Sequence, residues 1–209
     1  MNMIKHRKCD RKGKTMNKIL IGLFFVFIDV NVSLGNMTVS LIPDFIGYIF
    51  LFLGLKQMQE ENYWFARTKS LAVVMLLYSA FSFCADLFGF KPGVLSGRLV
   101  VIFLGYLSTI ASLYVAWSII RGIKEMEEEK NYNFFAKRSK ASWKMIAIFQ
   151  LISPLCGIIG QMANAYLASV MNQWNMLLSI GGLIASIIFL RDFKYSRDAY
   201  IIYLREQKS

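Results

Sequence analysis

The sequence has a single histidine, His6, and only three cysteines among its 209 residues. His6 lies in a basic N-terminal segment, so histidine-based acid–base catalysis and histidine-rich metal sites have no support. Cys9, Cys84 and Cys156 are odd in number and widely separated, which argues against a disulfide framework. The sequence also lacks Gly-x-Ser-x-Gly, phosphate-loop and paired-cysteine patterns. We therefore expect no cofactor and no metal, and we do not expect an enzyme.

Charged residues are scarce, at 18% of the chain, whereas a soluble domain carries about a quarter. Hydrophobic residues make up 56% and occur in blocks of roughly 16 to 23, the length that a helix needs to cross about 30 Å of hydrocarbon. These blocks cover residues 18–34, 39–57, 70–89, 99–120, 144–166 and 174–190. We predict an all-α membrane helix bundle with six transmembrane helices. It spans residues 18–190, between a basic tail at 1–17 and a tail at 191–209 suited to the membrane surface.

Positive charge is nearly missing from one side of the predicted spans. Of the 24 Lys and Arg residues, 22 fall in residues 1–18, 56–69 and 121–144 and in the C-terminal tail. Only Lys91 and Arg98 fall on the other side. Short cytoplasmic segments carry such an excess, so we predict a multi-pass protein of a bacterial cytoplasmic membrane with both termini in the cytoplasm. The net charge of +11 then fits anionic lipid head groups on the cytoplasmic side rather than nucleic acid.

Two of the basic segments resemble each other. Gly54-Leu-Lys-Gln-Met-Gln-Glu-Glu-Asn-Tyr-Trp-Phe-Ala-Arg matches Gly122-Ile-Lys-Glu-Met-Glu-Glu-Glu-Lys-Asn-Tyr-Asn-Phe-Phe-Ala-Lys after two single-residue insertions, and Arg191-Asp-Phe-Lys echoes Arg121-Gly-Ile-Lys. We predict three tandem two-helix hairpins of about 70 residues, related by an axis along the membrane normal. The alternative is that the inner flanks of membrane helices simply share Lys, Glu and aromatic residues.

Three acidic residues stand apart from the basic segments: Asp29, Asp44 and Asp86. Asp29 lies roughly 16 Å along the first predicted helix, where a carboxylate needs a partner, a water-filled cavity or a proton. The following stretch, from Asp29 through Asn31 and Asn36 to Thr38, is polar for a connection this close to the bilayer. Two interpretations stay open: an early end of the first helix with residues 29–42 as a short extracellular or re-entrant turn, or an ordinary outer hairpin with Asp29 near its mouth.

Asp44 follows Pro43, a residue that is tolerated in the first turn of a helix because its missing N–H has no partner there. The helix dipole favours an acid at this position, so a helix-start role is one interpretation of Asp44. The other is a place in an outward-facing polar pocket. We take Asp29, Asn31, Asn36, Asp44 and Asp86 as its candidate lining residues.

Small residues recur at helical spacing and predict close helix packing. Gly47 and Gly54 lie two turns apart on one face of the second predicted helix. The last predicted helix contains two overlapping pairs, in the order Gly181, Gly182, Ala185 and Ser186. Packing within one chain is the favoured interpretation, and a homo-oligomer or a partner protein is the alternative.

The N-terminal hairpin carries a resemblance to a known group. Ile21-Gly-Leu-Phe-Phe-Val-Phe-Ile-Asp29-Val-Asn31, followed by Leu41-Ile-Pro-Asp-Phe-Ile-Gly-Tyr48, is similar to small, uncharacterised multi-span membrane proteins of Gram-positive bacteria. It covers the first two predicted spans. The resemblance implies an integral membrane protein and carries over no catalytic residue.

Three functional hypotheses follow. The first is a small-solute or ion permease, or a channel-like module, because intramembrane carboxylates favour a cation or a proton-coupled substrate. The second is a non-transporting scaffold or accessory subunit that binds lipid or a partner protein through its basic cytoplasmic face. The third is an intramembrane or lipid-modifying enzyme. Whether Asp29, Asp44 and Asp86 meet in one cavity distinguishes the first and third hypotheses from the second.

Overall fold

The computed structural model describes residues 2–28, 31–34, 37–40, 43–88, 95–162 and 165–207. Within these residues the chain forms six helices and one strand hairpin, in the order α1 (Asn2–Phe27), β1 (Asn31–Leu34), β2 (Met37–Ser40), α2 (Asp44–Met58), α3 (Tyr63–Leu87), α4 (Leu95–Lys130), α5 (Ala136–Met162) and α6 (Ala165–Glu206). The prediction of a helical protein is confirmed, and the hairpin is an addition to it. Three segments of the described part are long and apolar enough to cross a membrane: Tyr63–Ala85, Ile102–Lys130 and Ser169–Glu206.

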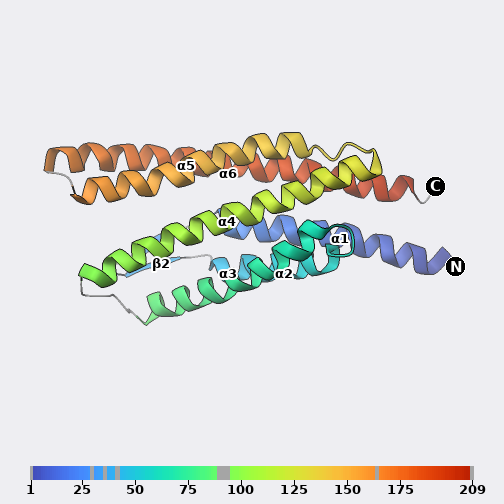
Figure 1. Ribbon diagram of the computed structural model, residues 1–209, viewed down its shortest axis with the longest axis horizontal. Helices are drawn as coiled ribbons and strands as arrows, with labels where there is room; N and C mark the ends of the chain where they lie inside the picture. The colour runs from blue at the N-terminus through green and yellow to red at the C-terminus, as the bar shows by residue number, and fades with distance from the viewer. Residues whose placement is uncertain are drawn as a thin grey trace.

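The helices pack as a closed ring in chain order. Each helix packs against its neighbour in the sequence, and α6 returns to pack against α1. In Figure 1, α5 and α6 form one pair, α2 and α3 lie on the opposite side, and α4 runs between them. Both termini lie at the same end of the long axis, which we call the terminal end; the opposite end is the far end. Every helix that leaves the terminal end is therefore followed by one that returns to it.

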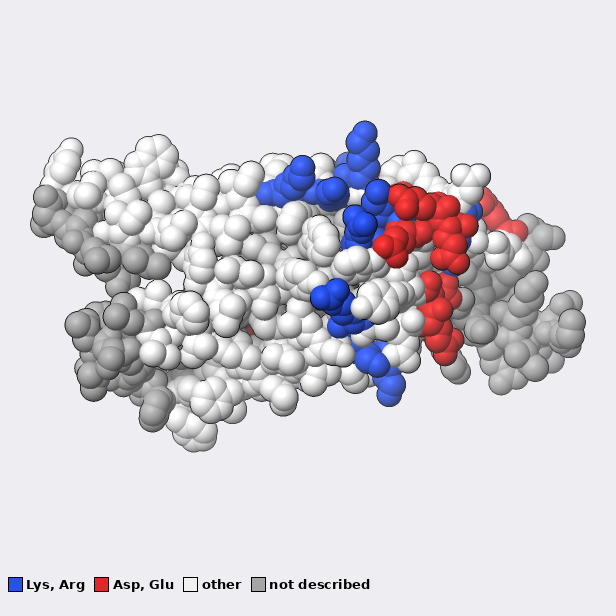
Figure 2. All heavy atoms as spheres, viewed as in Figure 1, with Lys and Arg blue, Asp and Glu red and all other residues white. Residues whose placement is uncertain are grey.

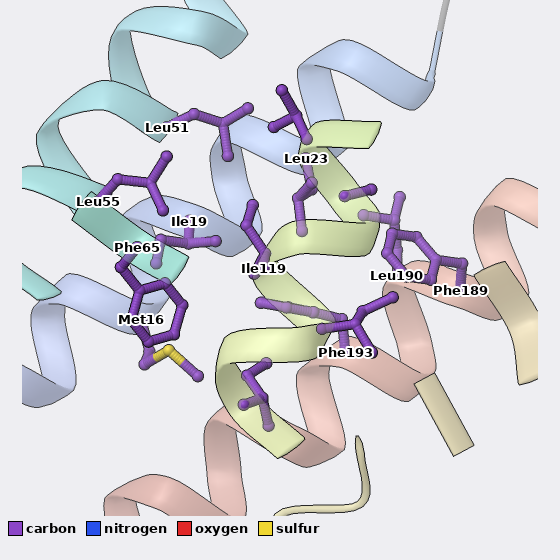
Figure 3. Close-up of a cluster of buried hydrophobic side chains, with 14 of the residues drawn as sticks. Met16, Ile19, Leu23, Leu51, Leu55, Phe65, Ile119, Phe189, Leu190 and Phe193 are labelled. Atoms are coloured by element: carbon purple, nitrogen blue, oxygen red, sulfur yellow. The ribbon is translucent and has the colours of Figure 1, made fainter. Parts of the chain in front are cut away.

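The buried core lies in the half of the ring nearer the terminal end. Figure 3 shows side chains of α1, α2, α4 and α6 turned toward one another. We call this cluster the inner core; it includes Met16, Ile19, Leu23, Leu51, Leu55, Phe65, Ile119, Phe189, Leu190 and Phe193. On α1, its members recur every three or four residues, the spacing of one helix face. Apolar side chains nearer the far end, such as Phe81 and Phe103, are instead 75% and 66% exposed.

Charged side chains gather toward the terminal end. On the face shown in Figure 2, Lys and Arg form a band, Asp and Glu lie beyond it, and the described surface toward the far end carries almost no charge. Lys and Arg side chains suit a membrane–water boundary because their stems bury against apolar surface while their charged ends stay in water. Such a band is typical of the membrane–water boundary of a membrane protein.

The first two helices do not cover the whole of the apolar stretches from which they were predicted, residues 18–34 and 39–57. α1 ends at Phe27 and α2 begins at Asp44, as the early-end interpretation requires. Between them, β1 and β2 pair antiparallel, with Asn31 opposite Ser40, and β2 contacts α3. Val and Thr recur through this polar stretch and favour strands over helix. Pro43 then sets the start of α2, since it cannot donate the hydrogen bond of an upstream helix.

The two repeat-like segments fold alike. Each contains the end of one helix, an asparagine-capped turn and the start of the next. Asn62 Oδ1 accepts the N–H of Trp64 at 2.7 Å before α3, and Asn133 Oδ1 accepts the N–H of Phe135 at 2.8 Å before α5. The second copy is the longer one, and its turn uses left-handed backbone at Asn131 and Phe135.

The segment predicted as a C-terminal tail continues α6 without a break as far as Glu206. Phe193, Ser196 and Tyr200 on this part of the helix are fully buried. The ring of Phe134, from the loop before α5, lies 5.7 Å from that of Tyr200. Residues 191–206 thus belong to the packed bundle, because their apolar residues recur at helical spacing and meet that loop.

Candidate functional site

A polar pocket of about 320 Å³ lies inside the ring, with walls from α1, α2, α4, α5 and α6. We call it the Asp44 pocket. Nine of its sixteen lining residues are polar: Asp44, Tyr48, Ser108, Thr109, Ser112, Gln150, Ser153, Ser179 and Ser186. Gly182, which also lines it, lies midway along the last predicted span. Polar groups at that depth of a membrane mark a functional site by default, because their burial is costly.

Several hydroxyl groups of the pocket donate their protons to the backbone. Ser112, Ser179 and Ser186 donate to the carbonyl three or four residues earlier in their own helices, at 2.8, 2.8 and 2.9 Å. Ser153 Oγ donates to Asn175 Oδ1 at 2.6 Å. A hydroxyl whose proton is committed in this way keeps its oxygen lone pairs as acceptors. The pocket is therefore rich in hydrogen-bond acceptors.

Asp44 is the one acidic residue that lines the pocket, and no Lys or Arg lines it, among the residues the structure describes. It is the first residue of α2, and Pro43 before it is extended, with φ −67° and ψ 125°. The free N–H groups of this first turn attract negative charge. Tyr48, one turn later, is 2% exposed and is hydrogen-bonded to Ser112. The structure thus places Asp44 both at the helix start and on the pocket wall.

The other four predicted lining residues cannot be compared with the pocket in the same way. Asp29 and Asn36 lie outside the described residues. Asn31 lies in β1 and Asp86 in α3, and their side chains are outside the described part. Of the five predicted lining residues, Asp44 is the one whose side chain the structure describes, and it lines the pocket.

Sequence reasoning did not identify Ser108, Thr109, Ser112, Gln150 or Ser153 as lining residues. A signal for Gln150 was present, because an amide in the middle of an apolar block needs a hydrogen-bond partner or a cavity. Each of these residues is unremarkable on its own helix. They line the same pocket only because the helices pack as a ring.

Glycines at the α1–α2 crossing set one wall of the pocket. A Cβ atom on Gly47 would lie 2.9 Å from the carbonyl oxygen of Gly22, and one on Gly22 would lie 2.8 Å from that of Gly47. A Cβ on Gly54 would lie 2.5 Å from Cγ1 of Ile19. The two backbones approach this closely only because all three residues lack side chains.

The small residues of α6 face inward as well. A Cβ on Gly181 would lie 2.6 Å from the ring of Phe149 on α5, and one on Gly182 would lie 3.6 Å from Cβ of the same residue. Ala185 and Ser186 are 1% and 2% exposed. These residues therefore pack within the chain. Phe149, which packs against Gly181 and Gly182, also lines the Asp44 pocket.

A polar cluster ties the first inner turn to the end of α4. Glu125 accepts hydrogen bonds from Asn62 Nδ2 at 2.9 Å and from Trp64 Nε1, and Arg121 Nε lies 3.8 Å from its carboxylate. The hydrogen bond from Asn62 holds the pKa of Glu125 below its ordinary value; partial burial opposes this, while Trp64, Arg121 and Lys124 add to it.

A second polar cluster joins α5 to the buried part of α6. Arg138 Nε lies 2.8 Å from Oδ1 of Asp192, whose side chain is 6% exposed. The hydroxyl oxygens of Ser139 and Ser196, both fully buried, are 3.0 Å apart. Among the described residues, no group of three or more His, Cys, Asp or Glu side chains is placed to hold a metal ion. The pairs Arg138–Asp192 and Ser139–Ser196 both connect α5 to α6.

Comparison with known proteins finds no family model that matches the chain, no similar curated protein and no similar solved structure.

Proposed function

We propose that the chain is a six-span protein of a bacterial cytoplasmic membrane that binds a small cation or cationic solute in the Asp44 pocket, as a permease or channel-like module. The pocket is the observation that carries this proposal. Its volume of about 320 Å³ falls within the range of ligand sites, roughly 300 to 1,000 Å³.

The membrane placement is supported by the apolar helices and by the charge distribution. Three segments qualify as spans by length and composition, and α1 contributes a shorter apolar segment, Thr15–Phe27. In a six-span arrangement the β1–β2 hairpin completes the first two spans beyond α1 and α2. Such backbone persists at membrane depth only inside the protein or along a cavity. The concentration of Lys and Arg near the terminal end supports a cytoplasmic location for both termini.

Three tandem hairpins are supported by the ring and by the two asparagine-capped turns. The pairs α1–α2, α3–α4 and α5–α6 follow one another around the ring. Units related by an axis along the membrane normal put a shared site at the centre, where one helix of each unit can reach it. The Asp44 pocket takes lining residues from all three pairs.

A cation is favoured over an anion by the chemistry of the lining. The pocket has one carboxylate, hydroxyl oxygens with committed protons, and no Lys or Arg among its lining residues. Such acceptors replace part of the hydration shell of a cation, whereas an anion in the pocket would face the Asp44 carboxylate. The ring of Phe149, also in the lining, adds an aromatic face for an organic cation.

The inner core separates the pocket from the terminal end. On α1, α2, α4 and α6, residues of this core follow the pocket residues on the terminal side. The pocket is therefore closed toward the cytoplasm, as in an outward-facing state. Release of a solute to the cytoplasm requires these side chains to separate.

The test compares Asp44→Asn with Asp198→Asn. Asp198 also carries a carboxylate, but it is 43% exposed and lies at the terminal end, where it pairs with Arg197. Purified protein is assayed for binding of sodium, potassium, methylammonium and choline, and for their flux into liposomes. We expect wild type and Asp198→Asn to bind one of these probes, and Asp44→Asn to bind it roughly tenfold to a hundredfold more weakly.

Equal binding and flux in the two folded variants would overturn the proposal. That result would favour the alternative, a non-transporting scaffold or accessory subunit that works through its basic cytoplasmic face. Circular dichroism and the melting temperature establish that each variant is folded before binding is compared.

A further inference from the structure

A second concave site lies where the ring closes, between α1 and α6. We call it the α1/α6 groove; its volume is about 490 Å³. On α1 it is lined by Leu20, Ile21, Phe24 and Phe25, and on α6 by Leu190 and by the apolar stems of Arg191 and Lys194, so that their charged ends lie at its rim. The groove is otherwise apolar and does not share a lining residue with the Asp44 pocket.

Arg191 and Lys194 are three residues apart on α6, so they lie on the same face of the helix. The side chain of Arg191 is 57% exposed, and its Nε lies 3.7 Å from Oδ1 of Asp192. Asp192 has a closer partner in Arg138, at 2.8 Å. Lys194 makes no ion pair with any residue that the structure describes. Both cations are therefore available to an anion at the groove.

Apolar side chains continue from this basic pair toward the far end. Ile184 and Ile187 precede Arg191 by seven and four residues, and they are 52% and 53% exposed. The stripe from Ile184 to Arg191 is about 10 Å long at the rise of a helix. Phe24, 43% exposed on α1, forms the facing wall. A ligand that fits this surface has an anionic head and an apolar chain.

We propose that the α1/α6 groove binds one anionic phospholipid of the cytoplasmic leaflet. The head-group phosphate lies between Arg191 and Lys194, and an acyl chain follows the groove past Phe24. Basic pockets between membrane helices at the cytoplasmic surface recognise lipid phosphates in this way. The two cations come directly after the apolar part of α6, at the proposed membrane boundary, which is where such a phosphate lies.

A second groove offers an internal comparison. It lies between α3 and α4, has a volume of about 280 Å³ and is lined by side chains such as Leu71, Val74 and Leu104, with no charged residue. Zwitterionic and anionic lipids fit it equally well, because only their acyl chains make contact. The α1/α6 groove has a basic pair that the α3/α4 groove lacks, so we expect the α1/α6 groove to select lipids by head-group charge.

The experiment measures lipid binding to the full chain in detergent by native mass spectrometry. The probes are phosphatidylglycerol and phosphatidylcholine with identical acyl chains. Each Lys or Arg near an anionic head group contributes about fivefold, so we expect the wild type to prefer phosphatidylglycerol roughly twentyfold at one site. The double variant Arg191→Gln/Lys194→Gln loses this preference. The matched control, Lys124→Gln/Lys140→Gln, removes the same charge from exposed positions away from the groove and keeps it.

A third variant, Ile21→Trp, fills the groove without changing its charge. It is expected to weaken phosphatidylglycerol binding at this site, and it provides an independent test should the double variant fail to fold. No head-group preference in the wild type, or an equal loss in the double variant and its control, would overturn the proposal. The inference requires a membrane protein but not a solute site, so Asp44→Asn is expected to leave lipid preference unchanged.

Discussion

Replacing Gly47 by alanine should loosen the crossing of α1 and α2 and with it one wall of the Asp44 pocket. The new Cβ would lie 2.9 Å from the carbonyl oxygen of Gly22, from Cβ of Phe25 and from Cγ2 of Val26. Ordinary contact begins at 3.4 Å, so the two helices must separate by about 0.5 Å. Two of the three obstructing atoms belong to the backbone or lie next to it, and a side-chain rotation does not remove them.

The size of the effect follows from two opposing terms. Overpacking at a tight contact costs about 1 to 3 kcal/mol. Alanine returns about 0.8 to 1 kcal/mol relative to glycine within a helix. The net loss lies between about 0 and 2 kcal/mol and is about 1 kcal/mol at the middle of these ranges. A loss of about 1 to 2 kcal/mol lowers the melting temperature by about 2 to 8 °C for a chain of this size.

Gly105→Ala is the matched control, because a Cβ at Gly105 on α4 meets no atom within 4 Å. It should leave the melting temperature unchanged or raise it slightly, since only the gain in helix propensity applies. Both variants are measured in the same detergent by circular dichroism. Equal melting temperatures for the two would refute the close approach of Gly22 and Gly47.

Two further predictions concern the polar clusters at the terminal end. Glu125→Gln should cost roughly 0.5 to 1 kcal/mol at neutral pH, more than the control Glu128→Gln, whose side chain is 64% exposed. Because the folded pKa of Glu125 lies below its ordinary value, the stabilisation is fully present above the ordinary value. It should disappear as the pH falls through the folded pKa, and a difference from wild type that persists in acid would contradict this. Ser196→Ala should lower the free energy of unfolding by about 1 kcal/mol or more, because it leaves the buried Ser139 hydroxyl without this partner. The measurement is a double-mutant cycle by thermal unfolding. Additive effects of Ser139→Ala and Ser196→Ala would show that the two hydroxyls do not interact.

Much of the helical architecture could be predicted because it depends on local properties of the chain. Apolar blocks of membrane length predicted helices, and the helical fold is what the structure has. Pro43 predicted the start of α2 at Asp44, since its ring fixes φ and removes a donor. The β1–β2 hairpin was not predicted, because four-residue strands are stable only through their pairing and their contact with α3.

The Asp44 pocket could be predicted only in part. Asp44 was a candidate because a carboxylate in an apolar block is unusual on its own. Gln150 and Thr109 were not candidates, since their significance depends on helices that are distant in sequence and adjacent in the ring. Local spacing likewise predicted that Gly47 is a packing residue, but not that its neighbour is the backbone of Gly22.

The contact between α1 and α6 also determines when the molecule can be completed during synthesis. Arg197 Nη1 donates to Asn17 Oδ1 at 3.0 Å, across a sequence separation of 180 residues. A ribosome adds about 5 to 20 residues per second, so α1 precedes its partner by roughly ten to forty seconds. Throughout that interval, the α6-facing side of α1 lacks its final partner. The first helix made is thus among the last to reach its final surroundings, and ring closure is a late step of biogenesis.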